Sequence, residues 1–231
     1  MLSISGIPIE VCKKNIKNMH LYVKPPDGKV TISAPLSMRD DAIERFARTR
    51  VSWIKKQLTK FDDQPRQSER EYVSGETLYI WGKQYYLQTE YGGRNSLVLS
   101  GDKAALTVRK ESSAEQRDNF VREWCRDLLK TEIERLMPKW EKTTGLKAAS
   151  WQTKYMTTRW GTCNRATGKI WLNLQLAKKT PECLEYIILH ELVHLVEKTH
   201  NKRFVSLMDK YMPMWKEVRA TLNGQALDYM E

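Results

Sequence analysis

LEYIILHELVHLV, residues 184–196, is apolar on nearly every side and carries two histidines, with Glu191 directly after the first of them. Residues four apart share one face of an α-helix, so His190 and His194 can offer imidazole nitrogens to a single ion. Glu191 is rotated from His190 by about 100° around the helix axis, and its carboxylate can therefore reach a water on the ion without displacing that water. This spacing predicts the H-E-x-x-H site of a metallohydrolase, with Glu191 as the general base.

The apolar surroundings favour metal binding over a structural role for these side chains. A glutamate and two histidines on a buried helix are costly unless something compensates them. A metal ion does so, whereas a purely structural cluster would need several further polar partners. Because zinc is commonly bound through imidazole nitrogens, Zn2+ is the expected cofactor.

A third ligand is expected after the helix, and His200 is the leading candidate. On a continuing helix His200 would lie about 9 Å beyond His194 and on another face. It can bind the same ion only if the helix ends just after His194, and the polar residues 198–201 allow such a turn. Asp209 and Glu217 on the following helices are alternative ligands, and an ordinary surface role for His200 is the remaining alternative.

Hydrophobic periodicity predicts an α+β fold for the whole chain. Helices are expected from Asp40 or Asp41 to Phe61, from Ser112 or Ser113 to between Pro138 and Gly145, from Thr180 through His194, and over about 202–211 and 214–222. The second of these should bury Phe120, Trp124, Leu128, Ile133 and Leu136. Short β-type runs are expected at 19–24, 29–33, 77–81, 84–91, 97–99, 105–109, 151–153, 158–163 and 169–173. The four runs between 77 and 109 are interpreted as an antiparallel meander, and no internal repeat is evident.

Two parts of the chain are expected, although they can share one core. Residues 1–65 form a small α+β unit with a Pro-Pro-Asp-Gly turn at 25–28, and residues 66–231 hold the strand-rich segment and the metal-binding region. The polar stretch 62–71, which contains Pro65, is the best linker candidate.

Composition indicates the cellular setting and one class of partner. The 231 residues carry a formal net charge of +11, which favours polyanions such as nucleic acid. The four cysteines are far apart in the sequence, as is typical of free thiols in a reducing compartment. No apolar run is long enough to span a membrane, and residues 1–10 lack a signal-peptide pattern, so a soluble, cytoplasmic protein without a membrane partner is expected.

Several short motifs occur together in this chain. They are Leu21-Tyr22-Val23, Val30 to Pro35, Trp53 to Lys56, Tyr79 to Lys83 with Tyr86, Arg159 to Cys163, Ile170 to Asn173, His190 to Leu195, and His200 with Phe204. The set resembles the YgjP-like metallopeptidase family, a group of zincin-type domains related to the SprT and WLM groups, over almost the whole chain. Thr162 stands where the family usually has serine, and Val205 stands where a tryptophan often follows the phenylalanine.

The resemblance implies a zincin-like catalytic domain of antiparallel strands and an H-E-x-x-H helix, preceded by a small α+β unit. It implies His190, His194 and His200 as the zinc ligands, Glu191 as general base and acid, and a peptide or protein as the substrate. The ligand spacing matches that of metzincins, but Glu197 occupies the position of their turn glycine and argues against membership of that group.

Peptide hydrolysis also needs a donor to the developing oxyanion. Arg159 and Tyr155 are the candidates because they lie close in sequence to the other motifs, and Trp171 is a candidate substrate contact that can equally pack in the core. The strand 169–173 is expected to form the rim of the cleft and to pair with an extended substrate. Cys163 is interpreted as a packed thiol.

Two other functions are compatible with the sequence. The net charge of +11 allows a nucleic-acid-associated protein with a structural zinc, or a protease that acts on DNA-bound proteins. Three protein ligands plus a water would indicate catalysis, whereas a closed set of four ligands would indicate a structural ion.

Overall fold

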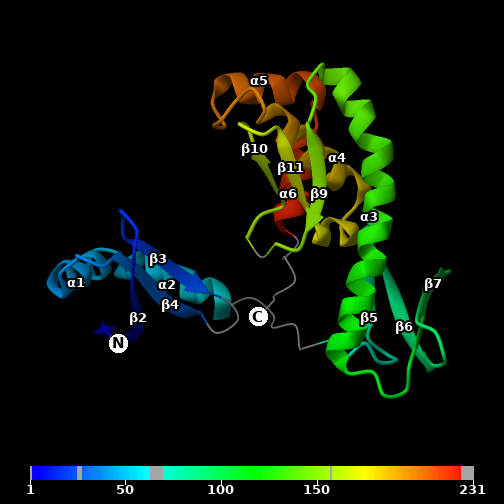
Figure 1. The fold of residues 1–231 in the computed structure, drawn as a ribbon, viewed down its shortest axis with the longest axis horizontal. Coiled ribbons are helices and arrows are strands. Elements are labelled where there is room, and N and C mark those ends of the chain that lie inside the picture. Colours follow the sequence, from blue (N-terminus) through cyan, green and yellow to red (C-terminus); the bar gives the residue numbers. More distant parts are fainter. Residues whose placement is uncertain (1, 25–27, 63–69, 157, 225–231) are drawn as a thin grey trace. The chain divides into compact units, whose positions relative to one another are not determined.

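The computed structural model describes residues 2–24, 28–62, 70–156 and 158–224 (Figure 1). It divides into two compact units, one within residues 1–68 and the other within 69–228. Helices and small sheets occur in both units, which makes the fold α+β as expected. The expected turn at 25–27 and most of the expected linker at 62–71 lie outside the described residues.

The first unit is a four-stranded sheet followed by two helices. Its strands are β1 (Leu2–Ile4), β2 (Ile7–Lys14), β3 (His20–Lys24) and β4 (Lys29–Pro35), in the order β1-β2-β4-β3, and its helices are α1 (Asp40–Arg48) and α2 (Val51–Asp62). The expectation of β3 and β4 is confirmed, whereas β1 and β2 were not predicted.

The single helix expected from residue 40 to residue 61 is wrong, because α1 ends before Thr49. The Thr49 hydroxyl and the Arg50 guanidinium both donate to the carbonyl of Phe46, at 3.0 and 3.2 Å. Side-chain donors that bond to carbonyls of the last turn compete with continued helical bonding. The apolar spacing continues across this break, so periodicity alone did not reveal it.

The second unit begins with another four-stranded sheet. Its strands are β5 (Thr77–Ile80), β6 (Lys83–Tyr91), β7 (Ser96–Ser100) and β8 (Lys103–Val108), in the order β5-β6-β8-β7. The expected antiparallel meander is wrong, because β8 lies between β6 and β7 and pairs in parallel with β6. The β7–β8 hairpin docks as a unit, and the Tyr86 backbone N–H donates to the Asp102 carbonyl in its turn at 2.8 Å.

The two four-stranded sheets share one topology, which corrects the expectation of no internal repeat. In each sheet the first two strands are antiparallel, the middle pair is parallel, the last pair is antiparallel, and a helix follows. The first hairpin of each sheet turns through two residues with positive φ, Ser5 and Gly6 (52° and 77°) and Trp81 and Gly82 (50° and 76°). Positive φ at both central residues defines a type I′ turn. The repeat is therefore clear in the backbone although the residues differ.

Helix α3 (Ala114–Thr144) begins and ends where its sequence signals predict. Ser113 forms a capping box with Gln116, and Gly145 ends the helix at a φ of 71°. The expected apolar face is displaced, because Phe120, Trp124 and Leu128 are only partly buried while Ile133 and Leu136 are buried. The other fully covered positions are Val121, Cys125, Leu129, Met137 and Trp140.

A three-stranded sheet and three helices complete the second unit. The strands are β9 (Ser150–Lys154), β10 (Gly161–Asn164) and β11 (Lys169–Asn173), and the helices are α4 (Pro181–Val193), α5 (Lys202–Tyr211) and α6 (Trp215–Gly224). The order is β10-β11-β9; β10 is antiparallel to β11, as the predicted hairpin requires, and β9 is parallel to it. A short 3-10 helix, η1 (Leu174–Lys178), leads from β11 towards α4.

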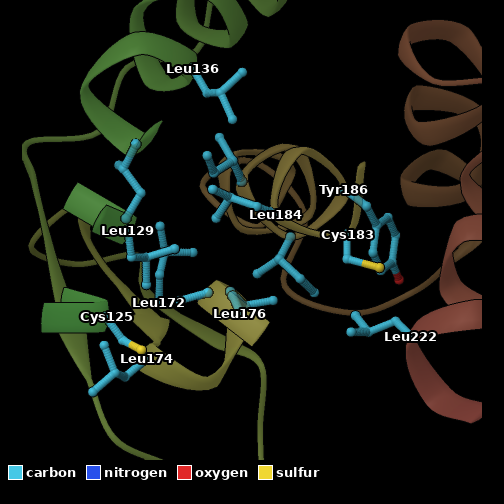
Figure 2. Close-up of a cluster of buried hydrophobic side chains, with 14 of the residues drawn as sticks. Cys125, Leu129, Leu136, Leu172, Leu174, Leu176, Cys183, Leu184, Tyr186 and Leu222 are labelled. Carbon is cyan, nitrogen blue, oxygen red and sulfur yellow. The ribbon is translucent and has the colours of Figure 1, made fainter. Parts of the chain in front are cut away.

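The core of the second unit surrounds helix α4. Figure 2 shows Leu129 and Leu136 of α3 in one cluster with Leu172 of β11 and Leu184 of α4. Proline at the first position of α4 fits the predicted start, but the preceding Thr180 makes no side-chain capping bond. Of the helices that the structure describes, none combines the length and the apolar character that crossing a bilayer requires.

Candidate metal centre

Helix α4 ends where the second histidine of the motif stands, and this ending brings a third histidine to the first two. The chain leaves the helix after His194, whose backbone N–H still bonds to the His190 carbonyl at 3.1 Å. Residues 195–199 then turn back, and His200 lies beside His190. The Nε2 atoms of His194 and His200 are each 3.1 Å from the Nε2 atom of His190.

The three imidazoles fit a divalent metal ion of the zinc type. Their ligand atoms all lie within 4.8 Å of one another, and they form the only such group of metal-binding side chains in the described parts of the chain. Zinc bonds of about 2.0–2.1 Å in tetrahedral directions separate two ligand nitrogens by about 3.3 Å, close to the 3.1 Å observed. The rival ligand Asp209 instead accepts from the Trp215 indole at 2.7 Å, and Glu217 is not part of the group.

The surroundings of the imidazole rings keep them in the form that binds a metal ion. The Nδ1 atom of His194 donates to the Glu197 carbonyl at 2.8 Å, which leaves the Nε2 lone pair free. Burial, followed by the neighbouring His194 and His200, lowers the pKa of His190 to about 3. The ring of His190 is therefore neutral at physiological pH, and neutral imidazole is the form that ligates.

The turn between His194 and His200 is held by four polar side chains. The buried carboxylate of Glu197 accepts from the Asn201 amide at 2.9 Å and pairs with Arg203 at 3.1 Å. Arg165 donates to the carbonyls of Leu195 and Val196 at 3.3 and 3.1 Å. These bonds fix a tight turn at the position where metzincins use glycine.

Glu191 lies under the backbone of Gly161, at the start of β10. A Cβ atom at Gly161 would come within 2.6 Å of the Glu191 carboxylate oxygen Oε1 and 2.8 Å of its Cγ. Glu191 is 4% exposed, and burial raises the pKa of its carboxyl to about 8, while the charge of Arg159 acts in the opposite direction. The glycine of the Arg159–Cys163 motif thus gives the carboxylate its space.

An open cleft of about 1080 Å³ lies over the three histidines. It is bounded by the segment 158–165, by Trp171, by α4 and by part of α6. Arg159 and Trp171 line this cleft, as does Cys163, whose pKa is raised to about 11, mainly by burial. Tyr155 is not among the lining residues, and its ring packs under the Arg122 guanidinium, 4.8 Å from the ring centre.

The rim strand is β10 and not the expected strand 169–173. That strand is β11, and both of its edges are already paired, one with β10 and the other with β9. In the described part of the chain no strand pairs with the outer edge of β10, and all four of its residues line the cleft. Hydrophobic alternation locates strands but does not give their order in a sheet.

The segment before β10 is held by one buried amide that the sequence analysis did not single out. The Asn173 amide donates to the carbonyls of Met156 and Arg159, both at 2.7 Å, and its oxygen accepts from the backbone of Gln175 at 3.1 Å. Asn173 has no exposed surface. Asn173 therefore fixes the position of the backbone that carries Arg159 and leads to Gly161, beside Glu191.

Two other cleft residues were missed, Tyr186 and Arg219. The Tyr186 hydroxyl lies 3.5 Å from His190 Nδ1, and Arg219 reaches the cleft from α6. Tyr186 could have been found, because it stands four residues before His190 on the same helical face. Arg219 has no such local signal.

Comparisons with known proteins place this geometry in context. A family model described as YgjP-like, metallopeptidase domain, matches residues 17–225. The metallopeptidase zymogen abylysin of Pyrococcus abyssi is 23% identical, with 41% of this chain and 96% of that chain covered and a TM-score of 0.37. The zymogen jannalysin of Methanocaldococcus jannaschii is 21% identical, with 40% and 94% covered and a TM-score of 0.36. Comparison with the curated proteins gives no significant match.

Proposed function

The chain belongs to the YgjP-like metallopeptidase family, and from that premise we propose that it is a zinc-dependent peptidase with Glu191 as its general base and acid. His190, His194 and His200 would hold the ion. The convergence of their three Nε2 atoms at the floor of an open cleft is the observation that carries this proposal. When bound, zinc supplies Lewis acidity, which polarises a carbonyl and lowers the pKa of a water molecule.

Two side chains of the cleft are proposed to carry out proton transfer and to stabilise the oxyanion. Glu191 accepts a proton from the attacking water and passes it to the leaving amine nitrogen as the C–N bond breaks. Its buried position favours this proton transfer, because burial brings the pKa of the carboxyl towards neutrality. The side chain that lines the cleft nearest in sequence to Gly161 and carries a permanent charge is Arg159, which we propose as the donor to the developing oxyanion.

The outer edge of β10 is the proposed docking strand for the substrate. An extended peptide can pair with a free strand edge through its backbone, which gives binding without dependence on side-chain sequence. β10 starts at Gly161, directly over Glu191, so a paired peptide would pass the general base. Trp171 is proposed to contact the side chains of this peptide from the cleft wall.

The arrangement favours a catalytic over a structural ion. The histidine group offers three ligand atoms, and no fourth histidine, cysteine or carboxylate among the described residues belongs to it. A structural zinc site is normally closed by four protein ligands. A nucleic-acid role with a structural zinc is therefore the weaker proposal.

Metal removal tests the proposed function. The purified chain should contain about one zinc per molecule, hydrolyse an unfolded protein, lose that activity on treatment with a chelator and regain it when zinc is added back. Elemental analysis measures the zinc content, and mass spectrometry of the products measures the hydrolysis. A protein that holds zinc but cuts no peptide under any of these conditions would contradict the peptidase assignment.

Gly161→Ala tests the contact between β10 and the general base. The added methyl would lie 2.6 Å from the Glu191 oxygen and 2.9 Å from the Ile187 Cγ2 atom, so the carboxylate must move. Displacement of a catalytic group by about 1 Å lowers turnover by about 100-fold, and we expect a loss of that size with zinc content unchanged.

Gly93→Ala is the matched control for this substitution, because no atom lies within 4 Å of its added methyl. Turnover and thermal unfolding are measured on both variants. Equal activity of the two proteins would show that the space over Glu191 is not required.

A further inference from the structure

The walls of the cleft carry an unusual balance of charge. Four cationic side chains line it, Arg159, Arg165, Lys198 and Arg219, and Glu191 is the one acidic side chain among its described lining residues. The whole chain is basic, but its acids and bases are more evenly matched, with 28 and 39 respectively. The excess of cations at the cleft is therefore greater than the composition alone would produce.

Three of the four cations lack an ion-pair partner among the described residues, although the charge of Arg159 does act on Glu191. In the described parts of the chain, Arg159, Lys198 and Arg219 form no ion pair. Arg165 is the exception in being bonded, but it donates to backbone carbonyls. Several arginines outside the cleft do form ion pairs; Arg126 and Arg135, for example, each pair with a glutamate one helical turn away.

The cations stand at both ends of the docking strand. Arg159 lies two positions before Gly161, the first residue of β10, and Arg165 directly follows Asn164, its last residue. With about 3.3 Å per residue along a strand, Arg159 lies about 7 Å from Gly161 in one direction and Arg165 about 13 Å in the other. Gly161 contacts Glu191, so an extended peptide would meet a cation on each side of the bond placed over the general base.

We propose that the cleft selects peptide segments with aspartate or glutamate side chains within about three residues of the cleaved bond. This inference rests on the proposed peptidase function and adds the class of substrate to it. Complementary charge gives selectivity between partners even where each exposed pair contributes little to affinity. A peptide fits better than a nucleic acid, because the free edge of β10 presents backbone groups that pair with another extended backbone.

Binding measured without cleavage tests the selection. The probes are two fluorescent peptides of equal length that differ only in carrying glutamate or glutamine around a central bond, and the protein is the zinc-loaded Glu191→Gln variant. Fluorescence anisotropy should give about tenfold tighter binding of the glutamate peptide, with a strong dependence on salt.

A double substitution and a matched control decide whether the cleft is responsible. Arg159→Gln with Arg219→Gln should remove the preference for the glutamate peptide. Arg94→Gln with Lys142→Gln removes the same charge from exposed positions that do not line the cleft, and it should keep the preference. Circular dichroism checks that both proteins are folded. Equal affinity for the two peptides, or equal loss in the two double variants, would overturn the proposal.

Two further measurements separate this inference from the proposed function. If the unmodified protein cuts both peptides with equal kcat/KM, the selection fails while the peptidase stands. If it cuts neither but still binds the glutamate peptide through Arg159 and Arg219, the peptidase fails while selective binding stands. A single-stranded DNA oligonucleotide can be tested in the same assay. If it binds through the same two arginines more tightly than the glutamate peptide does, the ligand of the cleft is a nucleic acid and the proposal of an acidic peptide is overturned.

Discussion

Glu191→Gln is expected to abolish peptide hydrolysis while the protein keeps its zinc, with turnover reduced by about three to four orders of magnitude. Glutamine has the shape of glutamate and fits the same space under Gly161, so the helix and the three histidines should be undisturbed. The amide cannot accept the proton of the attacking water, however, and no other described carboxylate lines the cleft to replace it.

The control for this experiment is Glu182→Gln on the same helix. Glu182 is an exposed residue of the first turn of α4, so its substitution removes one negative charge without reaching the cleft. Turnover of a quenched-fluorescence peptide and zinc per chain are measured on both variants. Unchanged turnover in Glu191→Gln would remove this residue from the mechanism, whereas loss of zinc would show that it serves the metal directly.

His200→Ala is expected to weaken zinc binding by more than about 100-fold and to lower activity at limiting zinc in parallel. Loss of a residue that only supports a ligand costs about 10–100-fold in metal affinity, and loss of a ligand itself should cost more. His200 is exposed, so its removal creates no cavity in the core, and the metal-free protein should unfold at the same temperature as before.

His20→Ala provides the comparison, because His20 is a strand residue of the first unit and outside the histidine group. Zinc affinity is measured by competition with a coloured chelator. Zinc binding in His200→Ala as tight as in His20→Ala would leave two protein ligands and would return Asp209 or Glu217 to consideration.

Helix α4, the helix proposed to bind the metal, could be predicted because the residue pattern that specifies it is local. Spacing of four residues, apolar surroundings and the proline at its start together define α4, and all of them lie between Thr180 and His194. The sequence indicated that His200 could bind the same ion only if the chain turned back after His194, but it did not predict the turn itself. The bonds of Arg165 that hold this turn join residues 30 and 31 positions apart, which no local pattern connects.

Features that depend on distant pairing were predicted poorly. The alternation of β6 and β8 identified both strands, but their parallel pairing and the edge position of β10 depend on how hairpins dock. Arg219 reaches the cleft only because α6 packs against α4. Trp124 is only partly buried for the same reason, because the elements that pack against α3 determine which of its faces is covered.

The second copy of the repeated sheet is linked to helix α4 by described contacts. In the second copy, helix α3 is shared: its first half bonds to the sheet side through Asp118 and Tyr72, and its second half reaches α4 through Lys139 and Glu185. A change in the second copy can therefore reach helix α4 through α3. The described residues that line the cleft all belong to the second unit. Substitutions confined to the first copy therefore leave every described lining residue of the cleft unaltered, so the role of that sheet can be tested separately from the chemistry proposed for the cleft.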